Sequence, residues 1–374
     1  MPAMARAAAP GPYRYGVLEH PFPFSLGHVH CIVYGCDGGG VTILPDSERQ
    51  FALLCDARAG YVRIDYAYAQ IMTKNGSGKD LLAAPNFTVA DAIVDRLRRC
   101  GITELPVILQ YAAGPLVSGG RGGSTPMAWI TSNDPTNAAH LPGYADFAQI
   151  VAQHVAQKYP QISRIELFNE PNNHGWGSFP VGGSYDSPAD ESGHEVALYM
   201  RAAYAAIKRS APQLTVVGPA IADGGRSTDP RTFLQNMYDA GCRKGTCWDV
   251  LSVHNYAWQD PDFNPDHLRT RFDVYKDLQQ IAAQHGDAAT HVMLTEWGFS
   301  TQPGNPYAFS EAIQALYIAK GFNRMLRDPT VDGITYVNVY NPAMDFWGYT
   351  SLVRQDFTFK PSYFVFKRYA AARN

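Results

Sequence analysis

The chain has 374 residues, of which 46% are hydrophobic and 17% charged, a composition typical of a globular protein with a large core. Its 31 Lys and Arg residues nearly balance its 34 Asp and Glu residues, which gives a formal charge of −3, and no block of like charge occurs. This balance provides no electrostatic footprint for nucleic acid or an anionic membrane. No apolar run approaches the roughly 20 residues of a membrane span, and no sequence pattern indicates an oligomeric state.

The N-terminus and the cysteines bear on the compartment. Residues 1–10 are mostly small and lack an apolar signal core, so they fit either an artificial extension or the stub left by cleavage. Among the six cysteines, Cys242 and Cys247 are spaced to close a small disulfide loop, although buried free thiols would fit nearly as well. No cysteine has metal-site spacing. The six cysteines together favour export, and we expect a secreted or periplasmic protein.

Residues 1–27 are rich in Pro and aromatic residues and are interpreted as an irregular lead-in. From His28 onward, apolar runs of strand length alternate with stretches of helical periodicity. We expect strands at residues 28–34, 61–65, 105–110, 164–169, 215–219, 250–254, 292–296 and 333–340. We expect helices at residues 46–57, 88–100, 142–159, 195–210, 230–240, 266–284, 310–327 and 361–371.

Eight strands that each precede a helix predict an α/β fold with a parallel sheet. Eight such units favour closure into a (β/α)₈ TIM barrel, which needs about 250 residues, and no composition break forces a second domain. We therefore expect one catalytic barrel spanning residues 28–374. In such barrels the chemistry lies at the carboxyl ends of the strands, where this sequence places Asp65, Glu170, His254, Glu296 and Tyr340.

Two of these strand ends carry a glutamate in a similar context. The strand ending in Phe168-Asn169-Glu170 stops at Pro171, because proline cannot continue a central ladder. The strand Val292–Glu296 also ends in a carboxylate, followed by Trp297 and Gly298. Retaining glycosidases need two carboxyl groups about 5–5.5 Å apart. The ends of strands four and seven face each other across a barrel mouth, so this pairing is geometrically feasible.

These motifs resemble those of clan A glycoside hydrolases, which are (β/α)₈ barrels with catalytic glutamates at the ends of strands four and seven. Phe168-Asn-Glu-Pro-Asn172 resembles the Asn-Glu-Pro motif of the clan, and Leu294-Thr-Glu-Trp-Gly298 its nucleophile strand. His254-Asn255-Tyr256 resembles the His-x-Tyr of strand six. The late Tyr340-Asn341 and Lys360-Pro-Ser-Tyr363 resemble glycoside hydrolase family 39 in particular. The resemblance extends from about His28 to near the end of the chain.

The resemblance implies a role for each matching residue. Glu170 would be the general acid/base and Glu296 the nucleophile of a retaining hydrolase of β-glycosidic bonds. The matching residues would bind the sugar or hold the nucleophile: Asn169 at the 2-hydroxyl, Tyr256 and Arg63 on Glu296, His254 on the floor of the site, and Trp347 stacked on the sugar. Arg63 as a purely structural ion pair and His254 as a satisfied core histidine remain alternatives.

We expect the pKa of Glu170 to be raised, chiefly by the negative charge of Glu296 and secondly by partial burial. When the glycosyl-enzyme forms, the charge of Glu296 disappears, and Glu170 can then act as a base.

Aromatic residues and loops supply the remaining candidates. Trp129 and Trp176 fall in apparent loops, where they could stack on sugars or simply pack, and Tyr340 ends the last strand. The long loop at residues 111–141 contains Gly119-Gly-Arg-Gly-Gly-Ser124, which lacks the ending of a phosphate loop and is interpreted as a flexible lip. His28 and His30 alternate on one strand without a third ligand. We therefore expect neither a metal nor another cofactor.

Several alternatives stay open. A transglycosylase would use the same residues and differ only in the acceptor. A catalytically silent barrel that binds carbohydrate is a second alternative, although it would not need a matched acid and nucleophile. A metal-dependent hydrolase would need a His/Asp cluster that the sequence does not assemble. Xylosidases of family 39 typically carry an additional β-sandwich, so this chain more closely resembles single-barrel bacterial members that act on polysaccharides.

Overall fold

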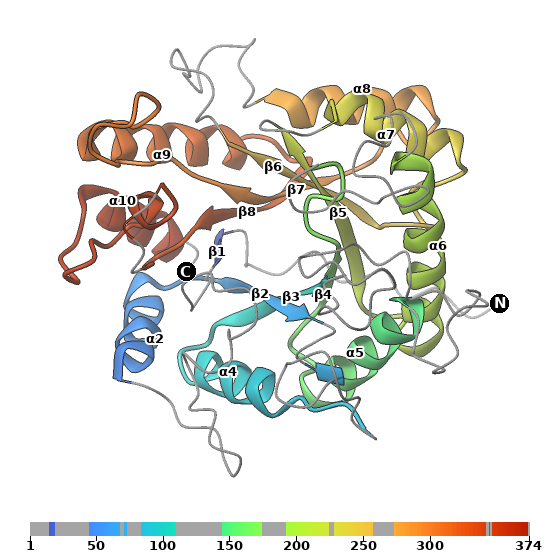
Figure 1. Ribbon diagram of the computed structural model, residues 1–374, viewed down its shortest axis with the longest axis horizontal. Helices are drawn as coiled ribbons and strands as arrows, with labels where there is room; N and C mark the ends of the chain where they lie inside the picture. The colour runs from blue at the N-terminus through green and yellow to red at the C-terminus, as the bar shows by residue number, and fades with distance from the viewer. Residues whose placement is uncertain are drawn as a thin grey trace, which may run out of the picture.

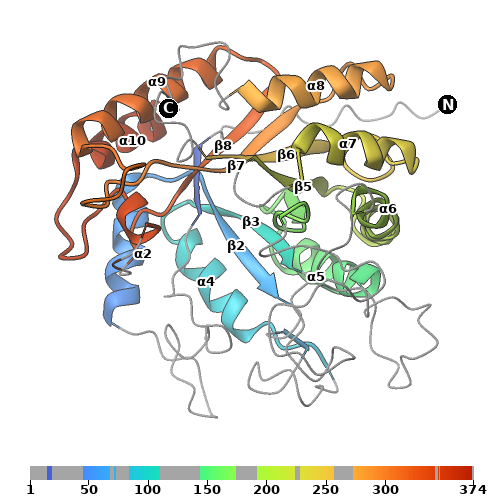
Figure 2. The same ribbon diagram turned by 45° about the horizontal axis from the view of Figure 1, so that its top comes forward.

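The computed structural model describes residues 15–18, 45–67, 71–72, 84–109, 144–173, 192–223, 228–256, 273–341, 344 and 346–372. Parallel strands alternate with helices along the chain, and the helices surround the sheet (Figures 1 and 2). The strands are β1 (Tyr15–Leu18), β2 (Tyr61–Ala67), β3 (Thr103–Leu109), β4 (Arg164–Leu167), β5 (Thr215–Asp223), β6 (Val250–Asn255), β7 (Val292–Trp297) and β8 (Val331–Val337). They pair in chain order, and β1 pairs with both β2 and β8, which closes the barrel.

Among the described residues, each strand is followed in sequence by a helix. The helices are α2 (Pro45–Ala57), α4 (Thr88–Arg98), α5 (Tyr144–Lys158), α6 (Ser192–Ser210), α7 (Pro230–Asp239), α8 (Val274–Gln284), α9 (Glu311–Leu326) and α10 (Pro361–Ala371), with a short 3₁₀ helix at Gly348–Thr350. Among the described helices, none combines the length and the apolar character that crossing a bilayer requires.

Strands β2 to β8 coincide with the predicted strands to within a few residues, but the first strand differs. The barrel takes its first strand from Tyr15–Leu18, inside the range interpreted as a lead-in, so the start of the barrel at His28 was wrong. The predicted strand at 28–34 lies outside the described residues. A strand of four residues that contains a glycine and has proline and aromatic neighbours offers too little alternation to be recognised in a sequence.

Helix starts follow from local chemistry. Asp229 caps α7 by accepting hydrogen bonds from the backbone N–H groups of Arg231 and Thr232, and Pro230 occupies the first turn. Ser310 caps α9 by accepting from the N–H of Ile313. These signals explain why the predicted starts of both helices agree with the structure.

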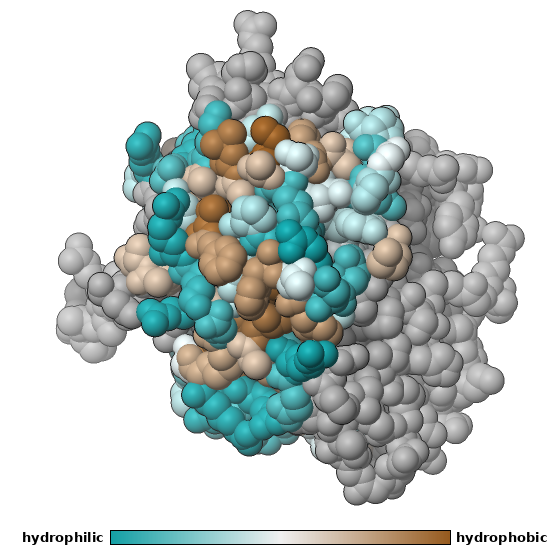
Figure 3. All heavy atoms as spheres, turned by 90° about the vertical axis from the view of Figure 1, so that its left-hand side faces the viewer, coloured by the Kyte–Doolittle hydropathy of each residue, from teal (hydrophilic) through white to brown (hydrophobic). Residues whose placement is uncertain are grey.

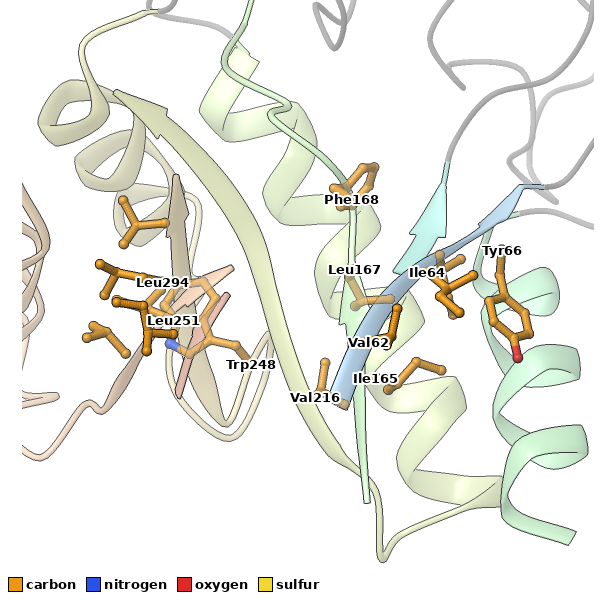
Figure 4. Close-up of a cluster of buried hydrophobic side chains, with 14 of the residues drawn as sticks. Val62, Ile64, Tyr66, Ile165, Leu167, Phe168, Val216, Trp248, Leu251 and Leu294 are labelled. Carbon is orange, nitrogen blue, oxygen red and sulfur yellow. The ribbon is translucent and has the colours of Figure 1, made fainter. Parts of the chain in front are cut away.

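The main core lies between the sheet and the helices. Alternate side chains of β2 and β4, including Val62, Ile64, Ile165 and Leu167, are buried in one hydrophobic cluster with side chains of the helices (Figure 4). A smaller cluster of buried side chains, Tyr61, Leu105, Val217, Val250 and Met293, comes from five different strands.

Because side chains alternate along a strand, this smaller cluster fills the interior of the barrel. Arg63 follows Tyr61 by two residues and therefore also points inward. On β4, Glu166 lies between the outward-facing Ile165 and Leu167, so it too points into the barrel.

The outer face over α2, α9 and α10 mixes hydrophilic and hydrophobic side chains (Figure 3). The exposed apolar residues of α9 and α10 are Leu316 and Phe364. Isolated exposed apolar side chains of this kind are ordinary on a protein surface.

Two disulfides link parts of the described chain. Cys55 of α2 bonds to Cys100 just beyond α4, and Cys242 bonds to Cys247 in the turn before β6. The predicted small disulfide loop is therefore confirmed. Cys31 and Cys36 lie outside the described residues.

We predict that removing the Cys55–Cys100 bridge costs more stability than removing the Cys242–Cys247 bridge. The first closes a loop with a sequence separation of 45 and the second one of 5, so chain entropy gives about 4 and about 2 kcal/mol respectively. Denaturant unfolding of Cys55→Ala/Cys100→Ala and Cys242→Ala/Cys247→Ala measures the difference. Equal losses for the two pairs would contradict the prediction.

A second prediction concerns Glu104 of β3, which is buried and accepts a hydrogen bond from the Tyr66 hydroxyl over 2.8 Å. Burial raises the pKa of Glu104 to about 8, the Tyr66 hydrogen bond opposes this, and the charge of Asp91 adds to it. The folded state therefore holds a proton that the unfolded chain releases near pH 4.3, so stability falls as pH rises from about 4.3 to 8.

The variant Glu104→Gln should remove this dependence and gain stability relative to the wild type as pH rises, on the order of a few kcal/mol. Unfolding at pH 5 and pH 8.5 measures it. Wild-type and variant stabilities that stay parallel between these two pH values would show that Glu104 is ionised throughout.

Candidate active site

The end of β4 delivers Asn169 and Glu170 into the barrel mouth through an unusual backbone turn. Phe168 and Glu170 have φ angles of 66° and 48°, which are strained for residues other than glycine. The N–H of Phe168 donates to the Tyr144 hydroxyl over 3.2 Å, and the N–H of Glu170 donates to the Ala220 carbonyl over 3.1 Å. Neighbouring elements thus hold the turn that aims Glu170.

Strand β7 delivers Glu296, whose exposed fraction is 7%. Each carboxylate oxygen has a donor: Arg63 Nη1 lies 2.6 Å from Oε1, and the Tyr256 hydroxyl donates to Oε2 over 2.7 Å. Gly298 allows the chain to pass close to β8, because a Cβ there would lie 2.6 Å from a methyl group of Val337. This close approach explains the glycine that ends the motif.

Arg63 is fully buried and joins three side chains of the site. Its Nε donates to Glu166 over 2.5 Å, its Nη1 to Glu296 and its Nη2 to the Asn169 amide oxygen over 3.0 Å. Burial disfavours the cation, but the charges of Glu166 and Glu296, and then of Asp65, outweigh it, so the pKa of Arg63 lies above its usual value. Arg63 is therefore a fixed positive charge beneath Glu296.

His254 lies between the two glutamates. Its Nδ1 is 2.9 Å from Oε1 of Glu170 and 3.5 Å from Oε2 of Glu296, and its side chain is fully buried. The Asn173 amide donates to the other oxygen of Glu170 over 2.9 Å. His254 thus contacts the catalytic candidates directly, as a residue on the floor of the site would.

The pKa of Glu170 is opposite in direction to the prediction. Burial acts to raise it, but the hydrogen bond and charge of His254, the hydrogen bond of Asn173 and the charge of Arg63 hold the pKa of Glu170 below its usual value. The prediction was wrong because the sequence does not show that a histidine nitrogen lies within hydrogen-bond distance of this carboxylate.

One carboxylate oxygen from Glu170, one from Glu296 and one ring nitrogen of His254 all lie within 4.8 Å of one another. Donors of this kind suit a divalent cation, and these three residues form the metal-capable group found among the described residues. Within this group, Nδ1 of His254 also lies within hydrogen-bond distance of Oε1 of Glu170. Absence of a metal and of any other cofactor stays a prediction.

The predicted aromatic residues differ in their placement. Trp347 is half-buried and packs edge-to-face against Tyr256, with 5.2 Å between the ring centroids. Tyr256 is the residue that donates to Glu296. Tyr340 is buried, stacks on Phe357 at 4.2 Å and donates to the Gln355 carbonyl. Tyr340 therefore has a packing role in these contacts, and substrate contact by it stays a prediction. Trp129 and Trp176 lie outside the described residues.

The segment that carries Trp347 is held by buried polar groups. The Lys360 ammonium donates to the Tyr349 carbonyl over 2.8 Å and to the Thr301 hydroxyl over 3.0 Å, and Gln314 donates to the Thr350 carbonyl over 3.2 Å. Burial lowers the pKa of Lys360 to about 8. These contacts fix the loop after β8 against the loop after β7.

Glu166 and Asn173 are members of this site that the sequence reasoning missed; Asn173 donates to Glu170. Glu166 is fully buried and lies in the interior of the barrel against Arg63. The available signal was a charged residue inside the apolar run Ile165-Glu166-Leu167, because a buried carboxylate needs a partner.

The fold and site can be compared with known proteins. No protein-family model and no curated protein matched the sequence. Solved structures match with TM-scores of 0.63 for a family 39 glycoside hydrolase from Bacteroides cellulosilyticus WH2, 0.62 for a glucosidase from Croceicoccus marinus and 0.57 for a β-xylosidase from Caulobacter crescentus CB15. Sequence identities are 19%, 17% and 17%.

The alignments cover 96%, 96% and 97% of this chain but 64%, 68% and 69% of those proteins. The chain therefore spans about two thirds of the length of these proteins. At this level of identity the similarity establishes the fold, which is that of family 39 and related clan A glycoside hydrolases.

We predict that Arg63→Met destabilises the protein strongly near neutral pH. It would leave Glu166 and Glu296 buried without their cation, which costs about 3–5 kcal/mol. The loss should shrink near pH 4, where these carboxylates can take up protons. Unfolding at pH 7 and pH 4 measures it.

The control for this variant is Arg231→Met. Arg231 is half-exposed and pairs with Asp229 and Asp277 at the surface, so its loss should cost no more than about 1 kcal/mol. Similar costs for the two variants would show that the interior cluster around Arg63 is not tightly coupled.

Proposed function

We propose that this protein is a retaining glycoside hydrolase that cleaves β-glycosidic bonds in an oligo- or polysaccharide, with Glu170 as general acid/base and Glu296 as nucleophile. The observation that carries the proposal is the separation of the two carboxylates, whose nearest ligand oxygens lie within 4.8 Å. Retaining enzymes place their carboxyl groups about 5–5.5 Å apart, whereas inverting enzymes leave about 6.5–9.5 Å for a water molecule. Similarity in fold to glycoside hydrolases also supports the proposal.

The surroundings of Glu296 support its role as the nucleophile. Glu296 accepts from Arg63 and Tyr256 on its two oxygens, which favours the carboxylate and fixes its direction of attack. Burial and the charge and hydrogen bond of Glu296 raise the pKa of Tyr256 well above its usual value. Tyr256 therefore stays a neutral donor throughout the working pH range.

Oε1 of Glu170 and Nδ1 of His254 are 2.9 Å apart, within hydrogen-bond distance. In the first step, Glu296 attacks the anomeric carbon while the glycosidic C–O bond breaks, and the leaving oxygen takes a proton from Glu170. The Glu170–His254 pair is the source of that proton. The sugar is then held as an ester on Glu296, and the charge of this carboxylate is gone.

In the second step, Glu170 removes a proton from water while the water oxygen attacks the anomeric carbon, and the bond to Glu296 breaks. Two successive displacements retain the configuration of the sugar. Asn169 is oriented for a role in both steps, because its amide oxygen accepts from Arg63 and its NH₂ group is left to donate to the sugar 2-hydroxyl. Trp347 would stack on the sugar beside Tyr256, and Trp129 and Trp176 remain candidates for further sugar contacts.

We also propose that the protein works outside the cytoplasm, in a secreted or periplasmic location. The disulfides Cys55–Cys100 and Cys242–Cys247 support this proposal, because such bonds persist mainly in oxidising compartments.

The test is turnover of a panel of aryl β-glycosides and polysaccharides by the wild type, Glu296→Ala and Glu170→Ala. We expect Glu296→Ala to lose turnover by several orders of magnitude, since no covalent intermediate can form. Added azide should restore product of inverted configuration. Glu170→Ala should keep its first step on a dinitrophenyl glycoside, which needs no protonation, and azide should then give a product of retained configuration.

The matched control is Glu104→Gln, a change at another buried carboxylate of the barrel wall that lies outside this site. NMR of the first product formed by the wild type decides the stereochemistry. An inverted anomer, or full turnover by Glu296→Ala, would exclude the proposed mechanism. Binding of sugars without turnover by the wild type would instead favour a carbohydrate-binding barrel.

A further inference from the structure

Beneath the catalytic pair lies Glu166, a carboxylate that the proposed mechanism does not use. Its exposed fraction is 0%, and Arg63 Nε donates to its Oε2 over 2.5 Å. Its other oxygen, Oε1, is buried and has no hydrogen-bond partner within the described part of the chain. A buried, half-satisfied carboxylate is costly, so its presence at the centre of the barrel calls for a physical reason.

Glu166, Arg63 and Glu296 form a continuous buried row. The Arg63 guanidinium lies between the two carboxylates, with Nε toward Glu166 and Nη1 toward Glu296 over 2.6 Å. Two carboxylates around one guanidinium give a net charge of −1 when both are ionised. A single carboxylate would suffice to neutralise the arginine, so the second one makes the row anionic.

We propose that Glu166 is a positioning residue that tunes the nucleophile by sharing the charge of Arg63. This inference rests on the proposed function. By taking part of the attraction of Arg63, Glu166 leaves Glu296 less stabilised as an anion and therefore more reactive. The surplus negative charge also lies beneath the sugar, where positive charge develops in an oxocarbenium-like transition state.

The covalent intermediate supplies a second reason for Glu166. When Glu296 forms an ester with the sugar, Arg63 loses one of its two ionic partners. Without Glu166, the intermediate would contain a buried guanidinium with no carboxylate in direct contact, which is strongly unfavourable. Glu166 keeps Arg63 neutralised throughout the reaction and so stabilises the glycosyl-enzyme.

Other charged and titratable groups also face this row. His254, Tyr256 and Glu170 face Glu296 from the ends of β6 and β4. The charge of Glu166 acts on Tyr144 of α5, where it raises the pKa, and the charge of Asp65 raises the pKa of Arg63. None of these groups changes in the variant Glu166→Gln, which preserves the shape of the side chain and an oxygen acceptor for Arg63.

The first test is the pH dependence of kcat/KM for Glu166→Gln on an aryl β-glycoside that the wild type cleaves. Arg63 would then act on Glu296 alone, so Glu296 should ionise at lower pH, and the acidic limb should move down by about one pH unit. The plateau of kcat should fall about tenfold, the equivalent of one pK unit of lost stabilisation. The control Glu104→Gln, on the neighbouring strand β3 but outside the row, should leave the acidic limb in place.

The second test does not depend on turnover. It compares the thermal unfolding of Glu166→Gln, Glu296→Gln and the double variant. Each single variant leaves Arg63 one carboxylate in direct contact, whereas the double variant leaves it none in direct contact, so the loss in Tm of the double variant should exceed the sum of the two single losses.

A shifted limb together with this non-additive loss supports the inference. An active Glu166→Gln with an unchanged limb, or additive losses in Tm, overturns it. Absence of turnover by the wild type on every glycoside would overturn the proposed function instead, and the unfolding comparison would still decide whether the two carboxylates share Arg63.

Discussion

The buried guanidinium of Arg63 is the interaction on which the rest of the site depends. It lies inside the barrel because β2 alternates, so that Tyr61 and Arg63 point inward while Val62 and Ile64 face the helices. A cation at that depth is tolerated only with close counter-charges, and it receives them from β4 and β7. The need to neutralise one arginine therefore fixes the relative positions of three strands and of the carboxylates that they carry.

The ends of the strands set the orientation of the two glutamate side chains, which the interior charge does not determine. Phe168 and Glu170 adopt left-handed backbone conformations, and hydrogen bonds from their N–H groups to Tyr144 and Ala220 hold them there. At the end of β7, Gly298 allows close packing against β8, since only a residue without a Cβ can approach Val337 at that distance. Strain on one side of the mouth and close packing on the other bring two glutamates from distant parts of the sequence together.

Much of this arrangement could be predicted from the sequence, and the exceptions have physical causes. Strands such as Val292–Trp297 begin with consecutive apolar residues, and helices such as α7 begin at a clear cap, so both can be recognised from the local sequence. Tyr15–Leu18 is too short to show alternation, and its identity as a strand depends on partners at both edges of the sheet. The direction of the pKa shift of Glu170 and the position of Glu166 against Arg63 depend on distances between strands, which a sequence pattern does not contain.

The charges of the site also constrain one another through the reaction that we propose. Arg63 is the fixed cation of the interior row, and Nδ1 of His254 lies 2.9 Å from Glu170 and 3.5 Å from Glu296. Esterification of Glu296 removes an anion that faces both of them. Glu166 then balances Arg63, while His254 keeps Glu170 as its remaining carboxylate partner. Arg63 thus has two carboxylates in direct contact before the step and one after it, so it is not left as a buried, unpaired charge. An active site with a single carboxylate beside Arg63 would lose that protection at the moment when the covalent intermediate forms.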